Sequence, residues 1–268
     1  MRIGVFYDGT WFAHVSEYFA TAHPQGSPIA LEGLHDALRW RAHTSSGQPL
    51  ADCQVSEAHY VRGRRAAPSP AFDAVLANAG VLRHDLELYH GREKGVDVYL
   101  ALEAWDRATT APLDQVVLIT GDADFVPLVR RLTGRGIAVL VPVVDTHPGA
   151  LAADRAQLRT APLLQSTASD APSWHELFAP CETVGYPLRS PWLGGAPGQR
   201  WRGTVTGWRP GQTHGFITDT EGGSWYVSRE DIPRGFDALP LNARVSFAGS
   251  PIPSPGRDYP RAHSIRFG

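Results

Sequence analysis

Two carboxylates, separated by one residue, follow a short apolar run. The segment V-V-L-I-T-G-D-A-D-F-V-P-L, residues 116–128, places Asp122 and Asp124 directly after that run ends in Thr-Gly. Carboxylates this close repel each other, so the arrangement lowers stability unless a cation or a proton offsets the charge. The spacing predicts a metal-binding active site, although a single Asp in this position is also a common helix cap.

Two more aspartates occupy similar places in the chain. Asp8 follows the first apolar run, and Asp97 opens a long apolar segment. Functional side chains of parallel α/β sheets gather where the strands end, so we expect all four aspartates to share one edge of a sheet. Ligation by oxygen alone, without His or Cys nearby in the sequence, favours Mg²⁺ or Mn²⁺ over zinc.

The spacing of apolar residues predicts alternating strands and helices through residues 1–168. Strands are expected at residues 2–7, 54–61, 82–90, 116–120 and 137–144, with an edge strand at 161–165. Helices are expected near residues 31–40, 70–78, 96–107, 125–132 and 149–158. This alternation predicts an α/β fold, built from right-handed βαβ units with a parallel sheet between helix layers.

Several motifs in this part of the chain carry a family resemblance. They are E-K-G-V-D-V-Y-L-A-L-E at 93–103 and I-T-G-D-A-D-F-V-P-L-V-R-R-L at 119–132, supported by V-F-Y-D-G at 5–9 and Y-V-R-G at 60–63. On these motifs the chain, from residue 2 to about 166, resembles an NYN domain of the PIN-like nuclease superfamily. The resemblance implies a PIN-like sheet on which Asp8, Asp97, Asp122 and Asp124 are both the catalytic residues and the metal ligands. It also implies hydrolysis of RNA to a 5′-phosphate and a 3′-hydroxyl, with one or two Mg²⁺ or Mn²⁺ ions as cofactor.

The sequence departs from the family pattern beside the first acid. The family usually reads D-G-x-N after the first strand, and this chain reads D-G-T-W, so Trp11 stands where Asn would help to hold metal or substrate. The hydroxyl of Thr10 could replace it. Lys94, the only lysine, is either a phosphate-binding point charge or a solvated loop residue. A metal-dependent endoribonuclease, a catalytically inactive RNA-binding or regulatory scaffold, and a DNA nuclease all fit these motifs.

The C-terminal part, residues 200–268, has a different texture. Short strand-like runs separated by turns predict a small all-β barrel. The runs G-T-V-T-G-W-R-P-G-Q-T-H-G-F-I-T at 203–218 and S-W-Y-V-S-R-E-D-I at 224–232 resemble a cold-shock domain. That resemblance implies a five-stranded OB-type barrel that stacks the bases of single-stranded RNA on surface aromatic rings.

Four aromatic side chains fall at the stacking positions of that resemblance: Trp208, His214, Phe216 and Tyr226. Trp225 falls on a core-facing position. Other positions depart from the pattern, and Gly207 stands where a tryptophan platform is usual. The region has nine Arg against six acidic residues, a mild excess that suits a polyanion. Both an RNA-binding barrel and a barrel that contacts another protein remain open.

Composition narrows the class of protein. Hydrophobic residues make up 43% of the chain and charged residues 19%, which is typical of a packed protein and excludes a disordered one. Two distant cysteines predict neither a disulfide framework nor a zinc site. No apolar run has membrane-spanning length and no signal-peptide pattern is present, so we expect a cytoplasmic protein. Residues 169–199, rich in Pro, Gly and Ser, are expected to link the two domains, with their aromatic side chains packed on one of them.

Overall fold

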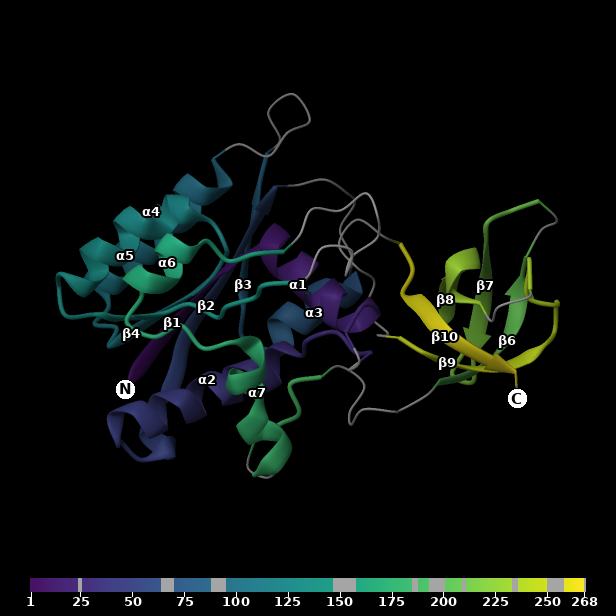
Figure 1. Cartoon of the computed structure of the whole chain (residues 1–268), viewed down its shortest axis with the longest axis horizontal. Coiled ribbons are helices and arrows are strands. Elements are labelled where there is room, and N and C mark those ends of the chain that lie inside the picture. The colour runs from purple at the N-terminus through teal and green to yellow at the C-terminus, as the bar shows by residue number, and fades with distance from the viewer. Residues whose placement is uncertain are drawn as a thin grey trace. The chain divides into compact units, whose positions relative to one another are not determined.

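The structure is a computed structural model in which two compact units can be described. It describes residues 1–23, 26–63, 70–87, 95–146, 158–184, 188–192, 201–208, 211–232, 236–249 and 258–267. The first unit contains a parallel sheet with helices and extends to Pro191, and the second contains a small barrel (Figure 1).

Five parallel strands form the sheet of the first unit. They are β1 (Arg2–Asp8), β2 (Gln54–Gly63), β3 (Leu82–Leu86), β4 (Gln115–Ile119) and β5 (Ala138–Leu140). Their order is β3-β2-β1-β4-β5, and every neighbouring pair is parallel. The central strands β1 and β4 are almost wholly buried, which explains why both read as continuous apolar runs rather than alternating ones. The predicted α/β fold is confirmed.

Helices cover both faces of this sheet. The helices are α1 (Gly9–Thr21), α2 (Leu31–Ser46), α3 (Pro70–Asn78), α4 (Val96–Thr110), α5 (Val126–Thr133), α6 (Pro162–Thr167) and α7 (Trp174–Thr183), with short 3₁₀ turns η1 (Leu50–Asp52) and η2 (Ala123–Phe125). Figure 1 shows α4, α5 and α6 on one face and α2 and α7 on the other. Neighbouring residues of β1 point to opposite faces of the sheet. Phe6 packs in the core with α4 and α5, whereas the Tyr7 hydroxyl forms a hydrogen bond of 2.9 Å with His35 of α2.

One predicted element is wrong. The edge strand expected at residues 161–165 is instead the start of α6. Pro162 occupies the first turn, where its fixed φ favours a helix, and Leu164 is fully buried against the core shared with α5. The strand expected at 82–90 ends at Leu86 in the structure. The helix expected at 149–158 falls outside the described residues, except for its last residue.

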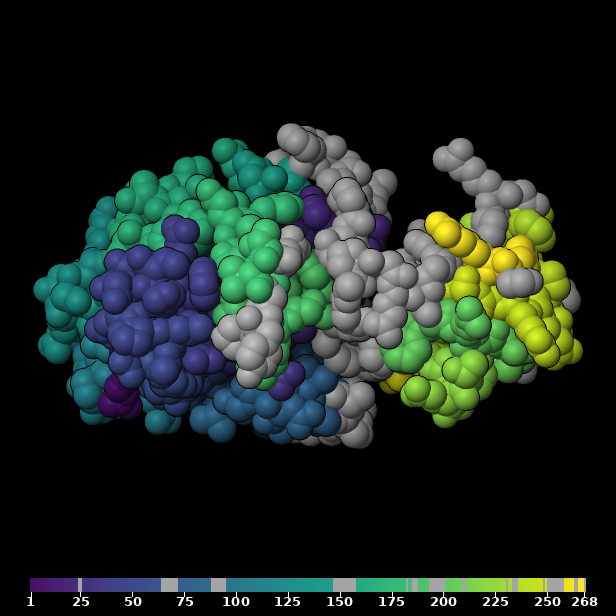
Figure 2. All heavy atoms as spheres, turned by 90° about the horizontal axis from the view of Figure 1, so that it is seen from below, coloured from purple at the N-terminus to yellow at the C-terminus, as the bar shows by residue number. Residues whose placement is uncertain are grey.

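Residues 170–191 contain α7, which packs on α2 of the first unit. Ser173 and Glu176 form a capping box that starts α7, and Trp174 and Phe178 are buried. Arg41 of α2 holds Asp170 by two bonds of 2.8 Å. The surfaces of α2 and α7 are contiguous in the space-filling view (Figure 2). The first unit therefore continues beyond residue 168, into the range expected to be a linker.

The second unit contains a closed five-stranded barrel. Its strands are β6 (Trp201–Gly207), β7 (His214–Asp219), β8 (Ser224–Ser228), β9 (Arg244–Ala248) and β10 (Arg261–Phe267), with the short turn η3 (Arg229–Asp231). Their order is β10-β8-β7-β6-β9, in which β10 pairs with β8 in parallel and with β9 antiparallel. Trp225 lies in the core, as predicted, and its indole N–H donates to Asp219 at 2.7 Å. Across the described part of the chain, no helix is both long and apolar enough to cross a membrane.

Candidate active site and nucleic-acid interface

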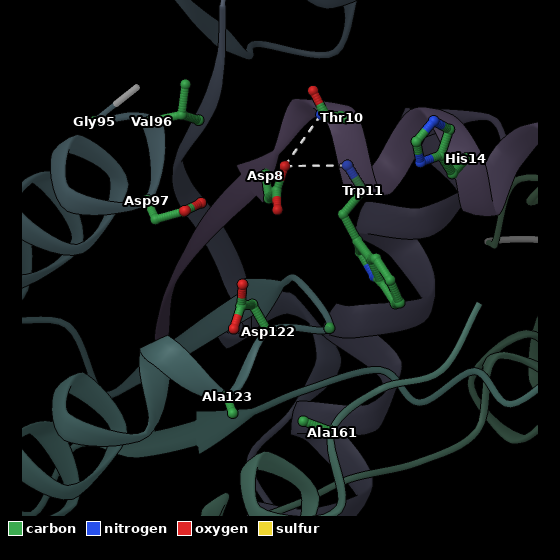
Figure 3. Close-up of a pocket in the computed structure, with 11 residues that line it drawn as sticks. Asp8, Thr10, Trp11, His14, Gly95, Val96, Asp97, Asp122, Ala123 and Ala161 are labelled. Atoms are coloured by element: carbon green, nitrogen blue, oxygen red, sulfur yellow. Dashed lines mark hydrogen bonds between the residues drawn. The ribbon is translucent and has the colours of Figure 1, made fainter. Parts of the chain in front are cut away.

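The first strand delivers Asp8 to the carboxyl end of the sheet. Its Oδ1 accepts hydrogen bonds from the backbone N–H groups of Thr10 at 3.1 Å and Trp11 at 3.0 Å, in the first turn of α1 (Figure 3). Its Oδ2 accepts the Thr120 hydroxyl, which follows β4, at 3.4 Å. These bonds orient the carboxylate and tie the ends of two adjacent strands together.

The surroundings of Asp8 disfavour its charged form. Burial is the main cause, and the nearby charge of Asp97 adds to it, while the N–H groups of Trp11 and Thr10 act in the opposite direction. The pKa of Asp8 is consequently raised from 3.8 to about 6. A cation beside the carboxylate would offset the repulsion and displace the proton.

Asp97 and Asp122 reach the same place from two other elements. Gly95, with a φ of +78°, starts α4, and Asp97 lies in its first turn. Asp122 follows β4, and its side chain accepts the Asp124 backbone N–H at 2.9 Å. In Figure 3 the carboxylates of Asp8, Asp97 and Asp122 face a common space. They line an open cavity of about 570 Å³.

The structure brings three of the four predicted acids together. Asp124 is exposed and is not among the residues that line the cavity. Thr10, predicted to bind substrate, does line it. Lys94 lies outside the described residues. Three carboxylates and a hydroxyl therefore line the cavity, and oxygen donors of this kind suit Mg²⁺ or Mn²⁺.

Trp11 forms one wall of the cavity. A Cβ on Gly121 would lie 2.3 Å from the indole ring, so the ring rests directly on the Gly121 backbone. Its Nε1 is buried and has no hydrogen-bond partner among the described residues. His14, one turn further along α1, is exposed and also lines the cavity. Sequence reasoning missed His14, although its spacing of three residues from Trp11 is the signal that places both on one helix face.

The contact between Trp11 and Gly121 predicts a strong coupling. Gly121→Ala should lower the free energy of unfolding by about 1–3 kcal/mol, because its new methyl group overlaps the indole ring. In a Trp11→Asn background, the same substitution should cost less than about 1 kcal/mol, since the smaller side chain leaves room. Chemical denaturation of the four proteins measures the coupling. Equal costs in both backgrounds would show that the ring does not pack there.

An aromatic cluster lies on the barrel, on the paired strands β7 and β8 and just before β10. His214 stacks on Tyr226 with centroids 5.5 Å apart and planes 24° apart. Phe216 meets Tyr226 edge-on at 6.2 Å and Tyr259 at 5.2 Å. His214, Phe216 and Tyr226 are half-buried and Tyr259 is exposed. Sequence reasoning missed Tyr259, because it precedes β10 and belongs to no alternating pattern.

Trp208 was predicted to stack on bases, and the structure places it elsewhere. Its ring is only 6% exposed and belongs to the barrel core, and its Nε1 donates to the Gln212 carbonyl at 3.2 Å. Aromatic residues near a strand end suit both a core and a stacking surface, and here the Trp208 ring packs in the barrel core. A buried ring offers no face to a base.

Comparison with known proteins identifies the first unit. The family model of the NYN domain matches residues 2–158, which is more than half of the chain. The chain belongs to the NYN domain family. An NYN domain is a PIN-like, nuclease-type domain, so the acid cavity lies in a nuclease-type fold.

Two further comparisons do not extend this family assignment. A crystal structure of a protein of unknown function from Vibrio parahaemolyticus RIMD 2210633 is similar, with a TM-score of 0.44 and 22% identity over 66% of this chain and 94% of that chain. No curated protein matches the chain.

Proposed function

We propose that this NYN protein is a divalent-metal-dependent endoribonuclease. The observation that carries the proposal is the meeting of Asp8, Asp97 and Asp122, from three separate elements, in one open cavity. Burial, and the nearby charge of Asp97, raise the pKa of Asp8, and a Mg²⁺ or Mn²⁺ ion beside this carboxylate would favour its charged form. Cleavage of labelled RNA in the presence of Mn²⁺ tests the proposal.

Four side chains of the cavity have a role in the proposed reaction. A bound divalent ion supplies Lewis acidity toward a phosphoryl oxygen and toward a water. Asp8 is held by the Thr10 and Trp11 N–H groups in one orientation, which suits a ligand that must not move. Asp97 and Asp122 are exposed, so a carboxylate oxygen not used for ligation can accept a proton from the attacking water. Thr10 stands where its hydroxyl can bind a phosphate oxygen.

We also propose that the barrel binds single-stranded RNA, as a cold-shock-like OB domain would. The five-stranded barrel and the cluster of His214, Phe216, Tyr226 and Tyr259 support this proposal. Half-exposed rings offer their faces to bases of any sequence, because every base has a π-face. The barrel would hold RNA that the acid cavity cuts.

Loss of one ring from this cluster should weaken RNA binding. Tyr226→Ala and Phe216→Ala should each lower the affinity for single-stranded RNA by about 5- to 100-fold, since stacking contributes about 1–3 kcal/mol per base. Fluorescence anisotropy with labelled RNA measures this. Phe236→Ala is the matched control, because Phe236 is 43% exposed and its ring partner is Phe267. Equal affinity of all four proteins would remove the aromatic cluster from RNA binding.

The second candidate is a catalytically inactive RNA-binding or regulatory scaffold. Trp11 favours it, because an indole ring occupies the wall where the family usually has an Asn. An inert parent protein that still binds RNA would support the scaffold. Single-stranded DNA of the same sequence, used in place of RNA, tests whether the cavity also cuts DNA.

A further inference from the structure

A cluster of two histidines and a glutamate lies between the sheet and α4, apart from the acid cavity. It consists of His59 on β2, His84 on β3 and Glu103 on α4. One ligand atom from each lies within 4.8 Å of the others. None of the three lines the acid cavity.

The spacing of these atoms matches a tetrahedral ion. His59 Nδ1 lies 3.0 Å from His84 Nε2 and 3.5 Å from Glu103 Oε1. A tetrahedral zinc ion with bonds of about 2.0–2.1 Å holds its ligand atoms about 3.3 Å apart. Small rotations of the two rings would therefore bring the three atoms to three corners of such a coordination sphere.

Each of the three side chains has an outer partner. His59 Nε2 lies 3.2 Å from Glu57 Oε2, and the Tyr99 hydroxyl lies 2.9 Å from His84 Nδ1. Arg107 donates to Glu103 at 2.9 Å. Metal-binding histidines usually use their second nitrogen in this way, and ligating carboxylates are themselves hydrogen-bonded.

The charges around the cluster also favour a cation. The Glu57 and Glu103 side chains are only 15% and 16% exposed, and Arg107 is the cation that contacts both. Glu57 Oε1 is buried and lacks a hydrogen-bond partner within the described residues.

We propose that His59, His84 and Glu103 form a zinc site with three protein ligands. Two imidazoles and one carboxylate suit Zn²⁺ better than Mg²⁺, which takes oxygen ligands. The ion would tie β2 and β3 to α4, the helix that carries Asp97 at its first turn. The zinc site does not depend on the RNA cleavage proposed above, and the two proposals are tested separately.

Zinc binding by the full chain tests this site. Chelator-treated protein is dialysed against Zn²⁺, and bound zinc is measured by elemental analysis, with thermal unfolding as a second readout. We expect one zinc equivalent with a raised Tm in the parent and in Asp122→Asn. Affinity should fall more than about a hundredfold in His84→Gln and Glu103→Gln, and about tenfold in Tyr99→Phe, which keeps the ring but loses the outer hydroxyl.

Three results would overturn the proposal. If the parent binds no zinc, or if Glu103→Gln and Tyr99→Phe keep the parent's zinc affinity, the two imidazoles share a proton in a hydrogen-bonded network only. Loss of the zinc equivalent in Asp122→Asn would place the ion in the acid cavity instead. Circular dichroism of each metal-free variant separates loss of a ligand from loss of the fold, and Tyr99→Phe serves if His84→Gln does not fold.

Discussion

Asp122→Asn should reduce Mn²⁺-dependent cleavage of RNA at least about a hundredfold and leave the fold intact. The substitution removes one of three carboxylates from the cavity. A metal ion that these carboxylates hold would stabilise the transition state by several kcal/mol. Stability should change by less than about 0.5 kcal/mol, because Asp122 is exposed and an Asn oxygen can still accept the Asp124 N–H. Initial cleavage rates and thermal unfolding measure both effects.

Two matched variants sharpen this test. Asp114 precedes β4 at the opposite end from Asp122 and is largely exposed, so Asp114→Asn should cleave RNA at the parent's rate. Asp124→Asn should lose less activity than Asp122→Asn, because Asp124 does not line the cavity. A parent-like rate in Asp122→Asn, or an equal loss in Asp114→Asn, would separate the cavity from catalysis.

Asp8→Asn should stabilise the metal-free protein at pH 8, by at most about 3 kcal/mol. The pKa of Asp8 is raised from 3.8 to about 6 in the folded state. Between these pH values the folded state holds a proton that the unfolded state has lost, so the contribution of Asp8 to stability falls as the pH rises through 6. An Asn has no such loss, and the shift of about two pKa units corresponds to about 3 kcal/mol.

The pH dependence checks the cause of this gain. Chemical denaturation of parent and Asp8→Asn, without divalent ions, should give a difference that is full above pH 7 and absent below pH 4. Asp122→Asn, an exposed acid of the same cavity, should show little of it. A gain in stability that is unchanged at pH 3, or a loss of stability at pH 8, would contradict a buried Asp8 whose charged form is disfavoured. Asp8→Asn should also lose RNA cleavage, which separates stability from function at this position.

The acids of the cavity could be predicted from the sequence, because each one lies directly after a buried strand or in the first turn of a helix. Asp8 and Asp122 follow the apolar runs that became β1 and β4, and Asp97 follows the glycine that starts α4. Parallel strands bring such positions to one edge. The different placement of Asp122 and Asp124 was not predictable, because it depends on the short turn η2, in which the first carboxylate caps the N–H of the second acid.

Other features depended on tertiary packing that the local pattern does not contain. Residues 161–165 have a strand-like apolar content, yet they begin a helix because Leu164 packs against the core of α5. The position of α7 on α2 depends on the distant pair of Arg41 and Asp170. His59 and His84 are 25 residues apart, and only the pairing of β2 with β3 brings their rings together.

A crystal structure of the protein with Mn²⁺ tests the central claim most directly, through the anomalous diffraction of the ion. We predict an anomalous peak in the cavity, within bonding distance of carboxylate oxygens of Asp8, Asp97 and Asp122. A cavity that lacks this peak at a Mn²⁺ concentration that supports cleavage, or a peak bound only by other residues, would contradict the metal-dependent nuclease.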